Sequence, residues 1–439
     1  MYHFEKLNNW LGKSPKLTFV LFGWMTAFVT YSGTYAFRKP IGAATFAGME
    51  QWGVDYKILV LTAQLIGYTL SKFIGVKYVS EMNNKQRPWL ILILISIAAT
   101  SLILFAIVPA PYNIFFMVLN GLPLGMVWGI VFSYLEGRTT TELLGAGLST
   151  TQIFSSGIVK SVGKWLMLEL NVSEFWMPAI TGLLFLIPLV LSVWLMDHLP
   201  VPSKEDERQR TKRMPMDGKA RWKFYLHFGF GLSMLLLLYV LLCVFRDFRD
   251  NFAAEIWVSL GKGNDAAIFT QTETPIFVVM LVIIALMMRI KNNMLAFQLN
   301  HLLLFGGCLL IAGATWLFES HMITPEVWIT LIGFGLYVGY VPYQIMLMDR
   351  LIAAFKYVST VSFLLLLSDG LGYLGSTGLL LYKNFGMPSA SYLTWMIKGS
   401  YIIGFMGATV TLVSSLYFIR RYKSQTAETT IAEPVMSGC

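Results

Sequence analysis

Long runs of apolar residues follow one another along almost the whole chain. Each run is close to the length of about 20 residues that a helix needs to cross the hydrocarbon core of a bilayer. A segment in lipid has to satisfy its backbone hydrogen bonds internally, so each run predicts a transmembrane helix and an all-α polytopic membrane protein. The twelve runs cover residues 17–40, 57–79, 89–109, 113–135, 145–168, 175–197, 225–248, 273–290, 297–318, 326–348, 355–382 and 394–420.

One long polar stretch divides these runs six plus six. It carries eight Lys and Arg together with four acids, which is typical of a solvated linker. The expected organisation is an N-terminal segment at 1–16, a six-helix bundle at 17–198, a basic linker at 199–224, a second six-helix bundle at 225–421 and a tail at 422–439.

Two short patterns recur at nearly one offset, which indicates that the two sets of helices are repeats. The matching pairs are Phe37-Arg38 with Phe248-Arg249, 211 residues apart, and the stretches 121–138 with 333–350, 212 residues apart. Parallel repeats of six helices predict two pseudo-symmetric bundles with a substrate site at mid-depth between them.

Composition excludes several other classes of protein. Hydrophobic residues make up 56% of the chain, charged residues 13%, and the mean hydropathy is +0.62, so too little charge is present to cover a soluble domain. The three Cys are scattered and the five His show no paired spacing, so neither a disulfide framework nor a metal or other cofactor is expected. The absence of a Gly-x-x-x-x-Gly-Lys loop argues against ATP as the energy source.

The net charge of +9 is distributed unevenly. Lys and Arg concentrate in the N-terminal segment, the loop between the second and third runs, the linker and the tail, whereas the loops on the other side hold acids. The positive-inside rule then places both termini and the linker in the cytoplasm, as in a multi-pass protein of a bacterial inner membrane. Membrane lipids are the expected partners of this charge, and nucleic acid is not.

Several cations interrupt the apolar runs, where each costs at least about 2.5 kcal/mol. Arg38 and Arg249 occupy equivalent positions in the two repeats, and a planar guanidinium can bind an anion through two parallel hydrogen bonds. We expect both to bind an anionic substrate, with Lys72, Arg246 and Lys160 as further substrate-binding candidates. The alternatives are snorkelling to the membrane interface and an ion pair with a neighbouring helix.

Asp369 is the only carboxylate that this pattern places well inside the second bundle. An intramembrane carboxylate is a functional candidate by default. Two roles stay open: Asp369 takes up a coupling proton, or it pairs with a cation such as Lys160.

Charged residues also stand at the cytoplasmic ends of the fourth and tenth runs. They form gating ion pairs between the bundles, or they are simply solvated helix ends. These residues are Glu136, Arg138, Asp349 and Arg350.

Three short motifs suggest a family. They are Tyr35-x-x-Arg38-Lys39 in the first run, Ser71-Lys-Phe-Ile-Gly75 in the second and Gly370-Leu-Gly-Tyr-Leu-Gly-Ser376 in the eleventh. They resemble signatures of the organophosphate:phosphate antiporters, the glycerol-3-phosphate and hexose-phosphate branch of the major facilitator superfamily. The resemblance implies that Arg38, Arg249 and Lys72 hold a phosphate group. The histidine of that branch's fifth helix has no counterpart, because the region reads Gln152-Ile-Phe-Ser-Ser156.

The expected function is therefore secondary transport of a small anionic, phosphorylated organic metabolite by alternating access. Exchange with inorganic phosphate and coupling to protons both stay open, and the transporter is expected to act as a monomer. The alternatives are a metabolite receptor on the same fold and a transporter of a carboxylate or lipid-linked substrate. We expect no enzyme and no catalytic residues, since Asp247, Asp250 and Glu255 have no His beside them.

Overall fold

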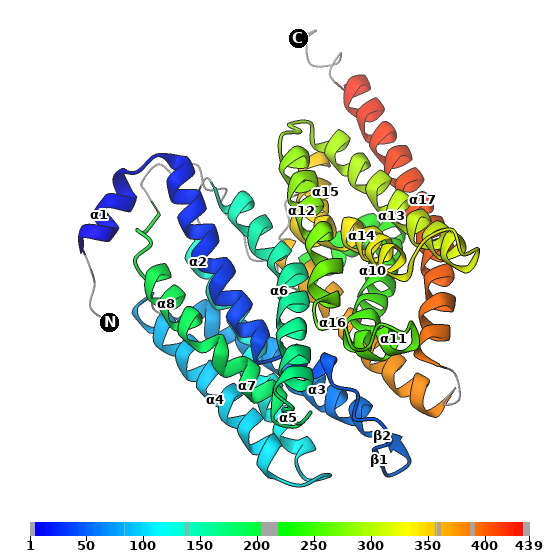
Figure 1. Ribbon diagram of the computed structural model, residues 1–439. Coiled ribbons are helices and arrows are strands. Elements are labelled where there is room, and N and C mark those ends of the chain that lie inside the picture. Colours follow the sequence, from blue (N-terminus) through cyan, green and yellow to red (C-terminus); the bar gives the residue numbers. More distant parts are fainter. Residues whose placement is uncertain are drawn as a thin grey trace.

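The computed structural model describes residues 5–432, apart from residues 83, 137, 139, 203–217, 356, 358–360 and 387–390. Nearly all of this length is helical (Figure 1). Most of the predicted basic linker and the last residues of the predicted tail lie outside the described residues. Below, the N-terminal half means the described residues up to 202 and the C-terminal half those from 218 onward.

The N-terminal half consists of helices joined by short connections. A two-stranded hairpin, in which Glu50 pairs with Asp55, joins the first long helix to the second. The elements of the N-terminal half are α1 (Glu5–Lys13), α2 (Lys16–Ala36), η1 (Pro40–Ala43), β1 (Glu50–Gln51), β2 (Val54–Asp55), α3 (Tyr56–Glu81), η2 (Asn84–Gln86), α4 (Arg87–Ile107), α5 (Ile114–Leu135), α6 (Thr141–Glu169), α7 (Met177–Leu184) and α8 (Leu186–Met196).

All the secondary-structure elements in the described residues of the C-terminal half are helices. One π-helical turn, η3, continues α14 into α15. The elements are α10 (Gly218–Asn251), α11 (Ala253–Ser259), α12 (Ile268–Met288), α13 (Asn293–Glu319), α14 (Pro325–Pro342), η3 (Tyr343–Leu347), α15 (Met348–Ala354), α16 (Val361–Phe385) and α17 (Tyr392–Ala432).

The chain is an integral, multi-pass membrane protein. Seven helical stretches in the described part are long and apolar enough to cross a membrane, and the pair α7 and α8, bent by 42°, makes an eighth if it counts as one span.

The two halves lie side by side (Figure 1). Contacts between them join α6 to α12, α3 to α16, and η1 to α10 and α11. We call the end of the molecule that holds β1 and β2 the hairpin end, and the opposite end, where α2 begins and α3 ends, the terminal end. Helices α2, α6, α10 and α16 therefore run from the terminal end towards the hairpin end.

The first long helix is shorter than the apolar pattern predicts. The pattern extends it to residue 40, whereas α2 ends at Ala36 and a turn carries the chain to the short helix η1. Pro40 explains the difference, because a proline has no N–H to donate to the carbonyl four residues earlier and its ring clashes with that carbonyl. Arg38 and Lys39 therefore lie on the turn between α2 and η1, where the backbone can direct neighbouring side chains to different surroundings.

Glycines hold α3 against α5 at close range. A Cβ atom added at Gly67 would lie 2.1 Å from the carbonyl oxygen of Val118, and one at Gly121 would lie 2.1 Å from that of Gln64. Only small residues allow helix backbones to approach this closely. This contact fixes the position of α3, which carries Lys57 and Lys72 towards the C-terminal half.

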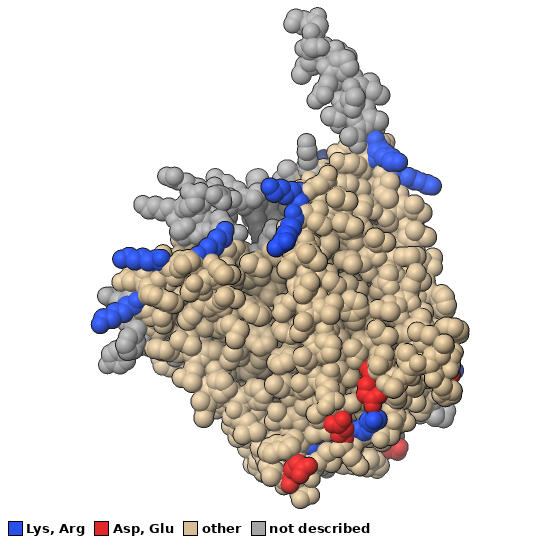
Figure 2. All heavy atoms as spheres, turned by 45° about the horizontal axis from the view of Figure 1, so that its top comes forward, with Lys and Arg blue, Asp and Glu red and all other residues tan. Residues whose placement is uncertain are grey.

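Surface charge differs between the two ends of the molecule. On the face shown in Figure 2, Lys and Arg gather near the terminal end, and acids lie near the opposite end beside a few cations. Exposed cations at the helix ends and loops of the terminal end include Lys13, Lys16, Arg289, Lys291, Arg420, Arg421 and Lys423. This asymmetry matches the one that the loops of the sequence show.

Candidate functional site

Four ion pairs cross between the two halves, and all have the same polarity. In the part of the chain that the structure describes, the N-terminal half supplies every cation and the C-terminal half every carboxylate of these pairs. The pairs are Lys39 with Asp250, Lys57 with Glu255, Lys72 with Asp369, and Lys160 with Asp250. The surfaces that the halves present to each other are thus complementary in charge.

Asp250 is the most densely contacted of these carboxylates. Its Oδ2 atom pairs with the Lys39 ammonium, while its Oδ1 atom pairs with the Lys160 ammonium and accepts a hydrogen bond from Ser156. Lys160 Nζ also donates to the backbone oxygen of Asp250 over 2.6 Å. Lys39 and Asp250 each follow one of the two Phe-Arg pairs, so their separation of 211 residues equals the offset of the repeat.

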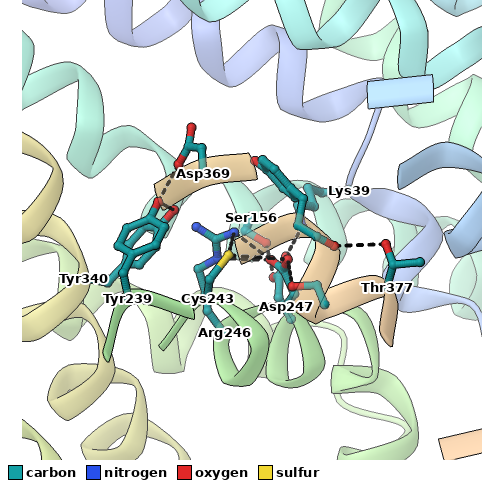
Figure 3. Close-up of polar contacts among 12 residues, drawn as sticks. Lys39, Ser156, Tyr239, Cys243, Arg246, Asp247, Tyr340, Asp369 and Thr377 are labelled. Atoms are coloured by element: carbon teal, nitrogen blue, oxygen red, sulfur yellow. Dashed lines mark hydrogen bonds and ion pairs between the residues drawn. The ribbon is translucent and has the colours of Figure 1, made fainter. Parts of the chain in front are cut away.

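A second pair joins α3 to α16 nearer the terminal end. Lys72 Nζ lies 2.6 Å from the carboxylate of Asp369, and both side chains keep about a quarter of their surface exposed, 25% and 21%. Tyr239 donates to the other oxygen of this carboxylate (Figure 3). Gln344 approaches the same oxygen at 3.4 Å. Gln344 lies in the π-helical turn η3, a type of irregularity that is frequent at functional sites.

A third pair closes the hairpin end. Lys57 Nζ lies 2.6 and 2.7 Å from the two oxygens of Glu255, and the lysine side chain is fully buried. Asp55 caps the start of α3 by accepting from the backbone of Lys57, and it also accepts from the Tyr392 hydroxyl of the C-terminal half. The start of α3 is thereby tied to both α11 and α17.

Arg38 has surroundings unlike those of the lysines. Its guanidinium carbon lies 3.6 Å from the centre of the Tyr68 ring, so the two groups are stacked. Among the described residues no carboxylate pairs with it, although it lies only partly exposed between the halves. A guanidinium stacked on a ring keeps its in-plane N–H donors available for an acceptor. Arg38 can therefore bind an anion without breaking an ion pair.

Arg246, in contrast, is neutralised by its neighbour. Its Nη2 atom lies 2.7 Å from Asp247, whose other oxygen accepts from Ser376 over 2.7 Å. In the view of Figure 3, the Arg246 side chain lies between the Tyr239–Tyr340 pair and Asp247, and its guanidinium carbon is 4.2 Å from the centre of the Tyr340 ring.

Arg249 is buried within the C-terminal half. Its Nη1 atom lies 2.6 Å from Glu273 of α12, and its Nη2 atom donates to the carbonyl of Ile329 over 3.3 Å. Lys160, Asp250 and this pair line a cavity of about 20 Å³, enough for one water molecule. The Nε atom of Arg249 and the second oxygen of Glu273 have no hydrogen-bond partner among the described residues, and a water in this cavity would supply one.

The four predicted gating residues lie at the terminal end. Glu136 is exposed at the end of α5, and Arg138 donates to the carbonyls of Tyr134 and Pro200 in its own half. Arg350 donates to Asn293 over 2.7 Å, also within its own half. Asp349 is exposed. Their role in gating stays a prediction.

The structure corrects the placement of the carboxylates. Asp369 is not the only one inside the C-terminal half, because Asp247, Asp250 and Glu273 are buried there too. Apolar patterning places a helix boundary at a charged residue and therefore starts the eighth segment at Glu273. In the structure α12 begins at Ile268, since the ion pair with Arg249 allows Glu273 to lie inside the helix.

The sequence did not indicate that Lys57 and Glu255 belong to the site. A lysine at the first residue of an apolar run is typical of a membrane interface, so nothing in the pattern distinguished Lys57. A usable signal was present in the acids that follow Arg246 and Arg249 at the end of the seventh segment. Buried acids need cations as partners, and of the four predicted helices that carry the candidate cations Arg38, Lys72, Lys160 and Arg246, three belong to the other half.

No group of three or more His, Cys, Asp or Glu in the described part of the chain is arranged to hold a metal ion. The arrangement consists of buried cations and carboxylates, paired across an interface, together with Arg38, for which the described residues supply no carboxylate. Such a site can bind and orient an anion.

Comparison with known proteins identifies a matching family and solved structures with a similar fold. The family of unknown function DUF5690 matches residues 40–421. None of the curated proteins compared with the chain matches it in sequence.

Several solved structures of transporters are similar along nearly their whole length. A peptide transporter POT has a TM-score of 0.57 at 13% identity, with 90% of this chain and 95% of that chain covered. The nucleoside transporter NupG has 0.59 at 13%, covering 91% and 99%. A D-xylose-proton symporter has 0.53 at 14%, covering 91% and 97%. At this level of identity, the similarity shows that the chain shares the fold of these transporters.

Proposed function

Since the chain belongs to the family of unknown function DUF5690 and has the fold of these transporters, we propose that it is a secondary transporter of a small anionic metabolite. The observation that carries the proposal is Arg38, a guanidinium between the halves that lacks a carboxylate partner among the described residues. A cation at this depth is costly unless an anion compensates it, and a bound substrate can be that anion.

The proposed transport step is alternating access between two six-helix bundles, residues 17–198 and 225–421. The ion pairs between the halves support it, because each can break as one end opens and form again as that end closes. In this arrangement Lys57 and Glu255 close the hairpin end. Glu136, Arg138, Asp349 and Arg350 are proposed to take part in closing the terminal end.

The proposed role of each cation follows from the partner that it has in this structure. Arg38 binds the anionic group directly. Lys72, Arg246 and Lys160 reach the ligand after exchanging a carboxylate for it. Arg249, predicted as a ligand from the repeat, would have to leave Glu273 first. Asp369 is proposed as the coupling group, because release of Lys72 would leave its carboxylate uncompensated.

An organic phosphate is the proposed substrate, exchanged for inorganic phosphate or moved together with protons. The resemblance of the motifs around Arg38, Lys72 and Gly370 to the organophosphate:phosphate antiporters supports this choice. The surface charge supports an orientation with the terminal end in the cytoplasm of a bacterial inner membrane. We further propose that one chain suffices for transport.

Binding tests the proposal first. The purified protein is heated with inorganic phosphate, glycerol 3-phosphate, glucose 6-phosphate, sulfate, succinate or glucose, and its unfolding temperature is compared. A ligand present at about 100 times its dissociation constant adds about 2.7 kcal/mol to stability. We expect stabilisation by the phosphates, loss of that effect in Arg38→Gln, and no effect of glucose.

Flux through liposomes then separates transport from sensing. Vesicles loaded with phosphate should accumulate labelled substrate in the wild type and not in Arg38→Gln. Binding without flux in either direction would make the chain a receptor. If succinate stabilises and the phosphates do not, the substrate is a carboxylate. A folded protein that responds to no anion contradicts the proposed function.

A further inference from the structure

We propose that Lys39, Ser156 and Lys160 form an anion site on the N-terminal half that Asp250 occupies in this structure. A carboxylate or phosphate group of the substrate takes the place of Asp250 when the halves separate at the hairpin end. The inference rests on the proposed function, and it names the groups that receive the anion after Arg38.

The geometry is that of a bound anion. Three donors from one half converge on the two oxygens of a single carboxylate from the other half. Ser156 and Lys160 are four residues apart on α6 and so share one face of that helix. Ser156, Lys160 and Asp250 expose 3%, 4% and 7% of their surface, so the contact is almost free of solvent.

The charges of this cluster do not balance. Two ammonium groups meet one carboxylate, whereas Lys57 with Glu255 and Lys72 with Asp369 are pairs of one cation and one anion. An ion pair that served only to hold the halves together would need a single cation. The second cation, with Arg38 next to Lys39 in the chain, leaves positive charge that an additional anion can neutralise.

The three donors and their anion lie on elements that can separate. Lys39 precedes η1, and Ser156 and Lys160 lie on α6, all in the N-terminal half, whereas Asp250 lies at the end of α10. If α10 moves away from η1 and α6, the donors stay together and lose their anion at once. Two neighbouring ammonium groups without a counterion are strongly unfavourable in a partly buried site. The substrate anion would restore the balance and favour the open arrangement.

Removing the competing carboxylate provides the test. Isothermal titration of inorganic phosphate, glycerol 3-phosphate and succinate is compared for the wild type, Asp250→Asn and Glu255→Gln. Glu255→Gln is the matched control, because it also removes a carboxylate that pairs between the halves but leaves the Lys39–Lys160 cluster intact. Asp250→Asn should bind the preferred anion at least about tenfold more tightly than the wild type, as expected when a charge competing for two cations is lost.

The outcomes separate this inference from the proposed function. A gain in Asp250→Asn that is absent in Glu255→Gln supports the inference, and the titrant that shows it distinguishes phosphate from carboxylate. An equal affinity in the two variants overturns the inference and leaves the proposed function standing, provided that the wild type binds an anion. If neither the wild type nor any variant binds an anion, the proposed function fails, and this inference with it.

A second measurement does not depend on how Asp250→Asn folds. Thr270 of α12 donates to Ser161 of α6 over 2.8 Å, so Ser161→Cys with Thr270→Cys places two thiols across the halves near this cluster. The disulfide would keep the halves together and Asp250 paired with Lys39 and Lys160. Oxidation should weaken anion binding about tenfold or more, and reduction should restore it. Unchanged affinity in the cross-linked protein overturns the inference.

Discussion

Arg38 and Arg249 follow a Phe at equivalent positions of the two halves, yet their surroundings differ. Arg38 stacks on Tyr68, with no carboxylate among the described residues, and Arg249 is held by Glu273 and the Ile329 carbonyl. The repeat predicts that both residues bind the same anion from symmetric positions. The structure instead gives one of them a free charge and the other a buried counterion, so substitutions at the two positions should have different effects.

The stacking of Arg38 on Tyr68 should matter for affinity. Tyr68→Leu removes the ring that orients the guanidinium, and such a contact contributes about 0.5–2 kcal/mol. We expect anion affinity in a titration to fall about tenfold. Tyr68→Phe keeps the ring and is the control, with affinity close to that of the wild type. Equal loss in both variants would mean that the hydroxyl, and not the ring, is the important group.

The Arg249–Glu273 pair should matter for stability. Glu273→Gln leaves Arg249 buried without its counterion, which costs about 3–5 kcal/mol. We expect a clearly lower unfolding temperature for Glu273→Gln and a smaller loss for the double variant Arg249→Met, Glu273→Leu, since both charges are then absent. Chemical or thermal unfolding in detergent measures this.

The double variant Arg249→Met, Glu273→Leu also tests the prediction from the repeat that Arg249 contacts the ligand. If the double variant folds but no longer binds an anion, Arg249 belongs to the ligand site. If the double variant still binds, Arg249 is a structural residue.

At the scale of elements, the position of α3 depends on its contact with α5. Gly121→Ala would bring a Cβ atom to 2.1 Å from a backbone oxygen of α3, and backbone atoms cannot rotate away. We expect a loss of at least about 2 kcal/mol in unfolding free energy and a weaker anion site, because α3 carries Lys72 and Tyr68. Gly370→Ala is the control, since nothing lies within 4 Å of an added Cβ atom there. Equal stability of the two variants would contradict the close packing.

The end of α2 shows how a local signal acts at this scale. Pro40 ends the helix before Arg38 and Lys39, and the turn sends the Arg38 guanidinium to Tyr68 and the Lys39 ammonium to Asp250. Consecutive side chains on a continuing helix would diverge by a fixed angle of about 100°. The turn allows Arg38 to stack on Tyr68 of its own half while Lys39 reaches Asp250 of the other half.

At the scale of the whole molecule, the pairs at the hairpin end hold the halves together. The double variant Lys57→Gln, Glu255→Gln removes both charges of one pair and so leaves no buried charge behind. We expect the hairpin end to open more often, which would raise the rate at which a maleimide modifies a Cys placed at Thr270.

The control for this experiment is Lys262→Gln. Lys262 pairs with Glu326 at the surface of the C-terminal half, and its loss should leave the rate unchanged. An unchanged rate in the double variant would show that the Lys57–Glu255 pair does not limit opening of the hairpin end.

Most of the fold follows from patterns that are local in the chain. Runs of apolar residues as long as a bilayer is thick predict helices, and helices of the structure lie over each of the twelve runs. The largest difference is at the last helix, which ends at Ala432 and not at residue 420.

The sequence by itself determined that the chain spans a membrane, that cations interrupt its apolar runs and that Arg38 and Arg249 are equivalent, because these are features of composition, length and spacing. Only the tertiary structure decided which cation has a counterion. The partners of Lys39, Lys57, Lys72 and Lys160 are 90 to 297 residues away in the chain. No spacing within one helix indicates them, since the pairing arises only when the faces of two separate halves come together.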